Sequence, residues 1–97
     1  MDYIGALASC QELNLFNNQI GDIGLSALAK ACADKGALAS CQKLILGGNQ
    51  IGDVGVSALA TAIESGALPQ VTYVSLFENP GNAEQVERAL RERKGNK

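Results

Sequence analysis

The sequence predicts an α/β fold of three consecutive strand–turn–helix units, and two observations lead to this prediction. The first is an internal repeat: the segment that starts at Gly5 returns almost unchanged at Gly36 and in a more divergent form at Gly66. The second is a change of hydrophobic period within each copy, from alternation in the front half to helical spacing in the back half. A near-identical segment at a fixed period is typical of one supersecondary unit that stacks on itself.

The front half of each copy is predicted to contain a short strand. In the first copy, Leu13 and Leu15 flank Asn14, so that alternate side chains point to one face. The second and third copies repeat this alternation, and we expect the flanking residues to form the buried face of each strand. The equivalent pairs are Leu44 with Leu46 and Val74 with Leu76.

The back half of each copy is predicted to contain a helix. Asp22 and Asp53 stand where an N-cap carboxylate would accept a free backbone N–H, and Gly36 and Gly66 follow the helices where a left-handed C-cap favours glycine. Apolar residues recur at helical spacing in every copy. The predicted stripes are Ala27, Leu28, Ala31 and Cys32, then Ala58, Leu59, Ala62 and Ile63, and finally Val86, Ala89 and Leu90.

The third helix differs from the other two in its charge. Residues 84–97 carry a net charge of +2, and we expect a solvated outer face whose cations complement the helix dipole. We therefore expect the third unit to act as a C-terminal cap. The spacing predicts a capping box of Asn82 with Gln85 and i,i+4 ion pairs between Glu84 and Arg88 and between Glu87 and Arg91.

The chain is long enough for one small domain, and we treat residues 1–97 as that domain. Its units span residues 5–35, 36–65 and 66–97. Hydrophobic residues make up 46% of the chain but aromatic residues only 4%, so the core must be aliphatic.

Composition also excludes several classes of function. The net charge of −2 argues against the basic surface that nucleic acid binding requires, and no apolar run is long enough to span a membrane. Because the chain has no histidine, a Ser-His-Asp or Cys-His nucleophile and a two-histidine zinc site are excluded. We therefore expect no enzymatic activity, no catalytic residue, no cofactor and no metal, and neither nucleic acid nor membrane as a partner.

A longer pattern unites the first two copies. The order L-x-x-C-x-x-L-x-L-x-x-N-x-I-G-D-x-G-x-x-A-L-A-x-A runs from Leu7 to Ala31 and again from Leu38 to Ala62. It resembles the leucine-rich repeat of the ribonuclease-inhibitor-like type, as in NOD-like receptors. The resemblance implies a curved solenoid with a parallel sheet on the concave side and helices on the convex side. It also implies a protein partner, which members typically bind through the concave face.

Three further motifs have structural interpretations. Asn18, Asn49 and Asn79 occupy one position in each unit, where a buried amide can pair with backbone groups of the turn. The GDIG and GDVG segments, residues 21–24 and 52–55, are expected to pack helices rather than cradle a phosphate, because each places an aspartate where the anion would sit.

The three cysteines are Cys10, Cys32 and Cys41. Cys10 and Cys41 occupy equivalent positions on consecutive units, and Val71 takes that position in the third, so we expect a column of small buried side chains. A disulfide or a shared soft metal remains an alternative for this pair.

Candidate partner-binding residues follow from the strand alternation. If Leu13, Leu15 and their equivalents point inward, their neighbours face solvent on the concave side. Three of the four aromatic residues fall in these outward columns, which favours a protein-binding surface. An alternative is that the rings roof over the core at the ends of the sheet. The candidates are Glu12, Asn14, Phe16, Lys43, Ile45, Tyr73, Ser75, Phe77 and Glu78.

The N-terminal side of the array predicts a second contact surface. No obvious cap precedes the first unit, so we expect either a fragment of a longer array or a homo-oligomer that covers the free strand edge. The odd cysteine count and the absence of a secretory signal favour the cytoplasm. Two alternatives to a protein-binding module stay open: a regulator of a partner enzyme, either GTPase-activating or enzyme-inhibiting, and an excised or engineered repeat block without a ligand.

Overall fold

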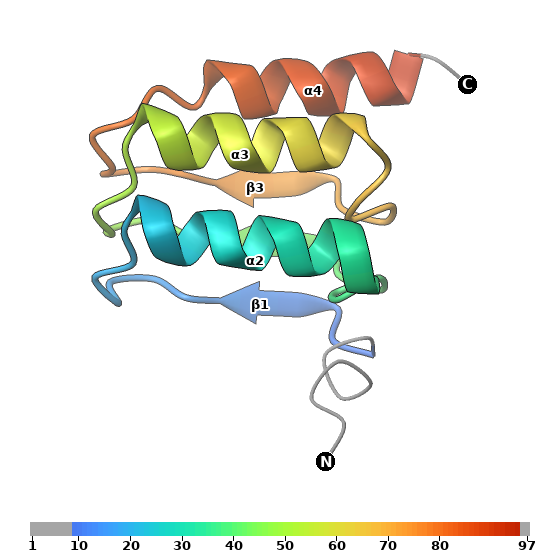
Figure 1. Ribbon diagram of the computed structural model, residues 1–97, viewed down its shortest axis with the longest axis horizontal. Helices are drawn as coiled ribbons and strands as arrows, with labels where there is room; N and C mark the ends of the chain where they lie inside the picture. Colours follow the sequence, from blue (N-terminus) through green and yellow to red (C-terminus); the bar gives the residue numbers. More distant parts are fainter. Residues whose placement is uncertain (1–8, 96–97) are drawn as a thin grey trace.

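The computed structural model describes residues 9–95, in which three strand–helix units follow one another (Figure 1). The start of the first unit at Gly5, Leu7 of the repeat pattern and Lys97 at the end of the chain lie outside the described residues. The order of elements confirms the α/β class, with one strand and one helix per copy. The elements are β1 (Glu12–Asn14), α2 (Asp22–Lys35), β2 (Lys43–Ile45), α3 (Asp53–Glu64), β3 (Tyr73–Ser75) and α4 (Glu84–Gly95).

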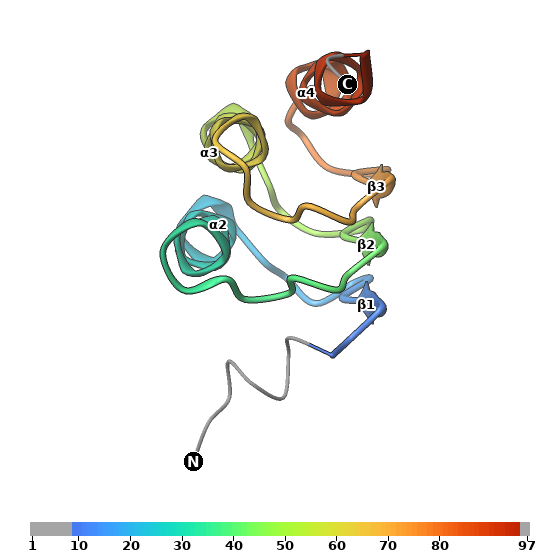
Figure 2. The same cartoon turned by 90° about the vertical axis from the view of Figure 1, so that its right-hand side faces the viewer.

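The three strands form one parallel sheet in the order β1-β2-β3. Glu12 pairs with Lys43 and Lys43 with Tyr73, so equivalent residues of the three units lie side by side. The strands lie along one side of the molecule and the helices along the other, and the helices spread further apart than the strands (Figure 2). The strand side is therefore the concave side of a curved solenoid.

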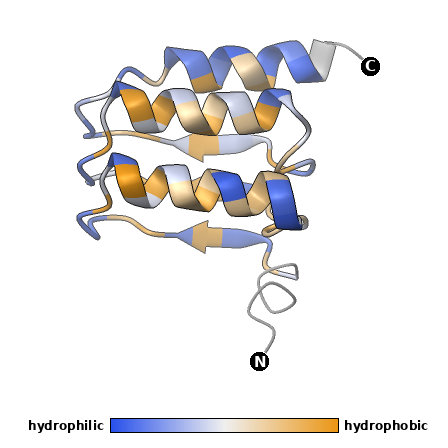
Figure 3. Ribbon diagram, in the orientation of Figure 1, coloured by the Kyte–Doolittle hydropathy of each residue, from blue (hydrophilic) through white to orange (hydrophobic). Residues whose placement is uncertain are grey.

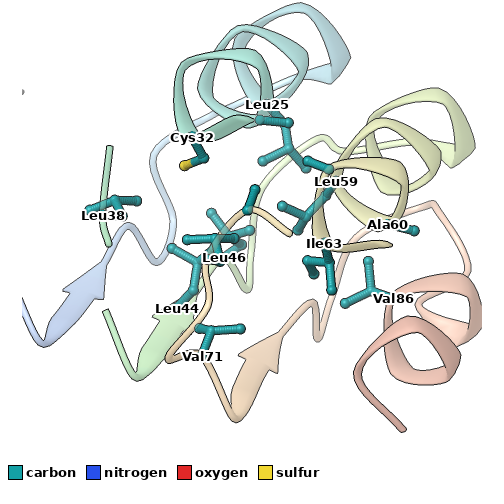
Figure 4. Packing of buried hydrophobic residues seen from close by; sticks show 14 of the residues in the cluster. Leu25, Cys32, Leu38, Leu44, Leu46, Leu59, Ala60, Ile63, Val71 and Val86 are labelled. Atoms are coloured by element: carbon teal, nitrogen blue, oxygen red, sulfur yellow. The ribbon is translucent and has the colours of Figure 1, made fainter. Parts of the chain in front are cut away.

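An aliphatic core fills the space between the sheet and the helices (Figure 4). Leu44 and Leu46 of the second unit are fully buried, as are Leu59 and Ile63 on the helix above them. This confirms the inward face that the strand alternation predicts. Figure 3 shows that α4 is largely hydrophilic, unlike α2 and α3. Within the part of the chain that the structure describes, no helix is long and apolar enough to cross a membrane.

Three of the four residues predicted for the apolar stripe of α2 are buried or pack against the core, and one is wrong. Leu25, Ala29 and Cys32 are the buried residues of this helix, whereas Ala27 is exposed. Alanine recurs at every second position from 27 to 33, so neighbouring faces of the helix look almost equally apolar in the sequence. Only the larger side chain of Leu25 indicates which face is buried.

The two predicted N-caps are also corrected. Gly21 and Gly52 occupy the N-cap positions, and neither contributes a side-chain bond. Asp22 instead reaches the next unit, where its Oδ1 accepts the N–H groups of Gly52 at 2.8 Å and Gly55 at 2.7 Å. Asp53 repeats the contact more weakly, accepting one N–H from Asn82 at 3.0 Å. The aspartates therefore join units rather than cap their own helices.

Glycine is required where the Asp22 carboxylate meets α3. A β-carbon on Gly55 would lie 2.6 Å from Asp22 Oδ1, well inside contact distance. This close approach confirms that the GDVG segment packs units together. Gly36 follows α2 with φ of 71°, as predicted for a left-handed C-cap, whereas α3 is capped by Ser65 and Gly66 follows with φ of 106°.

The asparagine position links consecutive turns. Asn49 is 7% exposed; its Oδ1 accepts the N–H groups of Asn18 and Ile20, and its Nδ2 donates to the carbonyls of Leu15, Leu46 and Gly47. Asn79 repeats this role toward the second unit. The prediction of burial is wrong for Asn18, which is exposed and whose side chain donates only to the carbonyl of Phe16 in its own turn. No described unit precedes it to supply the remaining groups.

The cysteines behave as core or near-core thiols. Cys10 and Cys41 each donate Sγ–H to a carbonyl two residues further on, at 3.1 and 3.2 Å. Cys41 is fully buried, Cys10 is half-buried and all three thiols are free. Burial raises the pKa of the Cys32 thiol to about 11. The column therefore serves packing in this structure.

The local contacts predicted for α4 form in part. Asn82 Oδ1 accepts the N–H of Glu84 at 2.9 Å, but the N–H of Asn82 is held by Asp53 instead of completing a capping box with Gln85. Glu84 and Arg88 form the predicted ion pair at 3.3 Å. Among the described residues, the predicted pair of Glu87 with Arg91 does not form.

Candidate functional site: the solvent face of the sheet

The concave side of the sheet carries the outward columns that the alternation predicts. Glu12, Lys43 and Tyr73 form one column, and all three are exposed. Asn14, Ile45 and Ser75 form the next, in which Ile45 and Ser75 are half-buried. The structure thus places six of the nine candidate residues on one continuous strip.

Three aromatic side chains border this strip. Phe16 and Tyr73 each expose 51% of their surface, and Phe77 exposes 71%. All three therefore lie outside the core, which contains no aromatic residue. Large rings left in water at this level are the side chains that gain most from burial against another protein.

Glycine in the second unit lets one of these rings approach the backbone closely. A β-carbon on Gly47 would lie 3.3 Å from Phe16 Cδ1 and 3.0 Å from the carbonyl oxygen of Phe77, and one on Gly48 would lie 3.3 Å from the Phe16 ring. Phe16 thus covers the turn of the neighbouring unit while half of it stays in water.

Charged side chains of both signs surround the aromatic residues. Glu12 and Glu78 are acidic, Lys43 is basic, and none of the three takes part in an ion pair within the described residues. Glu78 follows Phe77 in the left-handed region with φ of 61°, in the same turn position as Asn17 and Gly48. The side chain of Glu78 is exposed in this turn.

Asn14 has a local role in addition to its place in the strip. Its Oδ1 accepts the N–H of Phe16 at 3.0 Å, which closes the turn at the end of β1. This bond fixes the backbone that carries the Phe16 ring. Asn14 is therefore a positioning residue for Phe16.

Two exposed apolar residues lie outside every sequence-predicted site. Ile23 exposes 88% of its surface and Val54 exposes 67%, each directly after the aspartate that begins its helix. The sequence signal for this exposure is an apolar residue at the same position in two copies. A position next to an aspartate at a helix start is ordinarily polar, so the hydrophobic pattern alone does not point to a site there. They form a second apolar surface, on the helix side.

Comparison with known proteins identifies the repeat. A family model described as a leucine-rich repeat matches residues 11–29 and 42–60, which cover the strand, the turn and the first half of the helix in the first two units. Neither a curated protein nor a solved structure matches the chain.

Proposed function

Because the chain belongs to the leucine-rich repeat family, whose members generally mediate protein–protein interaction, we propose that it is a non-enzymatic module that binds a protein partner through the solvent face of its sheet. The family is typically non-enzymatic. Its resemblance to the ribonuclease-inhibitor-like type supports the same concave face as the contact surface.

The exposure of Phe16, Tyr73 and Phe77 is the observation that carries this proposal. Burying an aromatic side chain removes about 150–250 Å² from water, and a few such residues supply most of the binding energy of a typical interface. Tyr73 lies on β3, whereas Phe16 and Phe77 lie in the turns that follow β1 and β3. We assign them the role of apolar anchors, together with the half-buried Ile45.

The charged residues around the anchors supply the second part of the proposal. Glu12, Lys43 and Glu78 provide both signs of charge close to the rings. Rim charges of this kind change association rate and specificity more than affinity. We therefore expect a partner whose surface carries the opposite pattern around an apolar centre.

The edge of β1 supports self-association as a second contact. Within the described residues β1 pairs only with β2, and the side chain of Asn18 donates only within its own turn. An isologous dimer would pair the two free edges. We also propose a reducing compartment such as the cytoplasm, since all three cysteines remain free thiols.

The test compares two pairs of exposed apolar residues. We would immobilise the wild-type chain, a Phe16→Ala/Phe77→Ala variant and an Ile23→Ser/Val54→Ser variant, and compare the proteins that each captures from a cell lysate. The proposal predicts that the phenylalanine variant loses a captured protein, with an affinity at least about tenfold weaker, whereas the helix-side variant keeps it. Circular dichroism should be the same for all three chains.

Two results would contradict the proposal. Loss of helical signal in the phenylalanine variant would show that the rings support the fold. Loss of capture only in the Ile23→Ser/Val54→Ser variant would move the contact to the helix side of the solenoid.

A further inference from the structure

The last unit contains a groove between β3 and α4. It has a volume of about 730 Å³, and its apolar walls include Val71, Val74 and Leu90. Val74 and Leu90 are half-buried, although they belong to the core side of the sheet and helix. The groove is thus an open end of the aliphatic core.

In the second unit, the position that corresponds to this groove is filled by the third unit. Leu44 and Ala60, the second-unit equivalents of Val74 and Leu90, are buried because the third unit covers them. The part of the third unit that lies beside Leu44 is the extended stretch that contains Val71 (Figure 4). An extended chain with alternating apolar residues is therefore the shape that this groove accepts.

Among the described residues β3 pairs only with β2, and its other edge presents backbone groups to such a chain. In the second unit, the carbonyl of Gln42 accepts the N–H of Tyr73, and the N–H of Leu46 donates to the carbonyl of Ser75 at 2.8 Å. The same register turns the carbonyl of Thr72 and the N–H of Leu76 away from β2. These groups have the geometry to bind a further parallel strand.

The charge of the groove selects the kind of chain. Arg93 takes the helix position that Cys32 and Ile63 occupy in the other units, and its guanidinium donates to the carbonyls of Ala67, Leu68 and Val71 at 2.7, 2.7 and 3.1 Å. Within the described part of the chain, only carbonyl dipoles meet its charge. Arg91 lies beside it without an ion pair among the described residues, and Glu87 is the one acidic residue of the lining. The lining carries a net positive charge.

We infer that this groove binds an acidic segment of another protein in extended conformation, which adds as a fourth parallel strand to β3. The site is separate from the solvent face of the sheet, although Tyr73 borders both. Arg93 contacts the turn that leads into β3, so the arginines lie near the N-terminal end of the added strand. The acidic residues of the segment therefore precede its alternating apolar residues.

The test uses a peptide that copies a contact already present in the chain. The probe is acetyl-DEVTYVSLF-amide, in which two acidic residues precede the sequence of residues 71–77, and its binding to the full chain is measured by fluorescence anisotropy. The inference predicts saturable binding, and about tenfold weaker binding when both acidic residues are replaced by lysine. Arg91→Gln should weaken binding about threefold. Arg88→Gln, on the same helix but outside the lining, should leave it unchanged.

A second set of probes tests strand addition itself. N-methylation of the tyrosine in the peptide removes the N–H that would meet the Thr72 carbonyl, and should weaken binding about fivefold. N-methylation of the valine that follows removes an N–H that faces away from the sheet, and should have little effect. Amide chemical shifts should change at Thr72 and Leu90 on binding.

Several results would overturn the inference. These are absence of binding at millimolar peptide, equal binding of the acidic and lysine peptides, and equal effects of the two N-methyl groups. Shift changes confined to Phe16 and Gly47 would place the peptide on the solvent face of the sheet instead. None of these readouts depends on the concave-face proposal, so the two proposals fail independently.

Discussion

Replacing Asp22 by alanine tests whether the carboxylate holds the first two units together. The substitution removes two charge-assisted hydrogen bonds, to the N–H groups of Gly52 and Gly55 at 2.8 and 2.7 Å. Each such bond stabilises a fold by about 1.5–3 kcal/mol, and both donors are left without a partner at a half-buried site. We therefore expect Asp22→Ala to lower the free energy of unfolding by about 3 kcal/mol.

Asp53→Ala is the matched control. Asp53 holds the same position in the second unit but accepts only one N–H, from Asn82 at 3.0 Å, and its side chain is exposed. Its replacement should lower the free energy of unfolding by about 1 kcal/mol. The loss of a negative charge from the first turn of a helix is common to both variants, so the difference between them measures the inter-unit bonds.

A double variant makes the assay more specific. Gly55→Ala alone should destabilise, because the new β-carbon would lie 2.6 Å from Asp22 Oδ1. In the Asp22→Ala background the clash with the carboxylate is absent, whereas the contacts with Ile51 Cγ2 at 3.0 Å and with the Cα of residue 22 at 3.3 Å remain. Gly55→Ala should therefore cost less in this background than in the wild-type chain. Urea denaturation followed by circular dichroism gives all four free energies. The reasoning fails if Asp22→Ala costs no more than Asp53→Ala, or if the effects at positions 22 and 55 are additive.

Three other predictions follow from single sites. Asn49→Ala should cost about 3 kcal/mol or prevent folding, because it leaves several backbone groups of two turns unpaired, whereas Asn18→Ala should cost less than about 1 kcal/mol; urea denaturation compares them. Gly47→Ala should displace the Phe16 ring and cost about 1 kcal/mol, seen as altered ring proton shifts and a lower denaturation midpoint; unchanged shifts would contradict the contact. Burial raises the pKa of Cys32 from 9.0 to about 11, so the unfolded chain loses this proton first and stability should fall as pH rises between those values. A Cys32→Ala variant should show a smaller slope but not a zero slope, because burial also raises the pKa of Cys41; an unchanged slope would contradict the assignment to Cys32.

The strands and helices were predictable because the sequence combines a 31-residue repeat with an alternation of apolar residues inside each repeat. The 31-residue separation of Gly5 and Gly36 identified the unit, and the alternation around Leu13 and Leu15 placed the strand within it. These signals depend only on local chain geometry. The positions of Glu12, Lys43 and Tyr73 on one exposed column follow from the same alternation.

Contacts between units were harder to predict. An aspartate at a helix start has the same sequence signature whether it caps its own helix or reaches the next one, and Asp22 and Asp53 do the latter. The prediction of burial is wrong for Asn18 because an equal position in the repeat does not ensure an equal environment. Its partners would come from a neighbouring unit on one side, which the pattern of a single copy does not encode.

The exposed part of the candidate site also depends on contacts between units. Exposure of Phe16 depends on Gly47, whose backbone the ring covers, so a feature of the second unit decides the environment of a residue in the first. The groove at β3 and α4 has no counterpart in any one motif. It arises because Arg93 replaces an apolar side chain and because β3 has a free edge among the described residues.

The aspartate contact runs in one direction, from each unit to the next, and this limits how two copies of the chain can associate. Each aspartate passes a carboxylate forward to the next unit, but Ala83 stands at that position in the third unit and Arg93 fills the apolar column. A second copy stacked on the third unit would therefore find no carboxylate for the N–H groups of Gly21 and Gly24. Head-to-tail growth is disfavoured, and any association through the β1 edge should close as a dimer. Light scattering should then show a mass that levels off at twice 10.1 kDa with rising concentration, and continued growth would refute this reasoning.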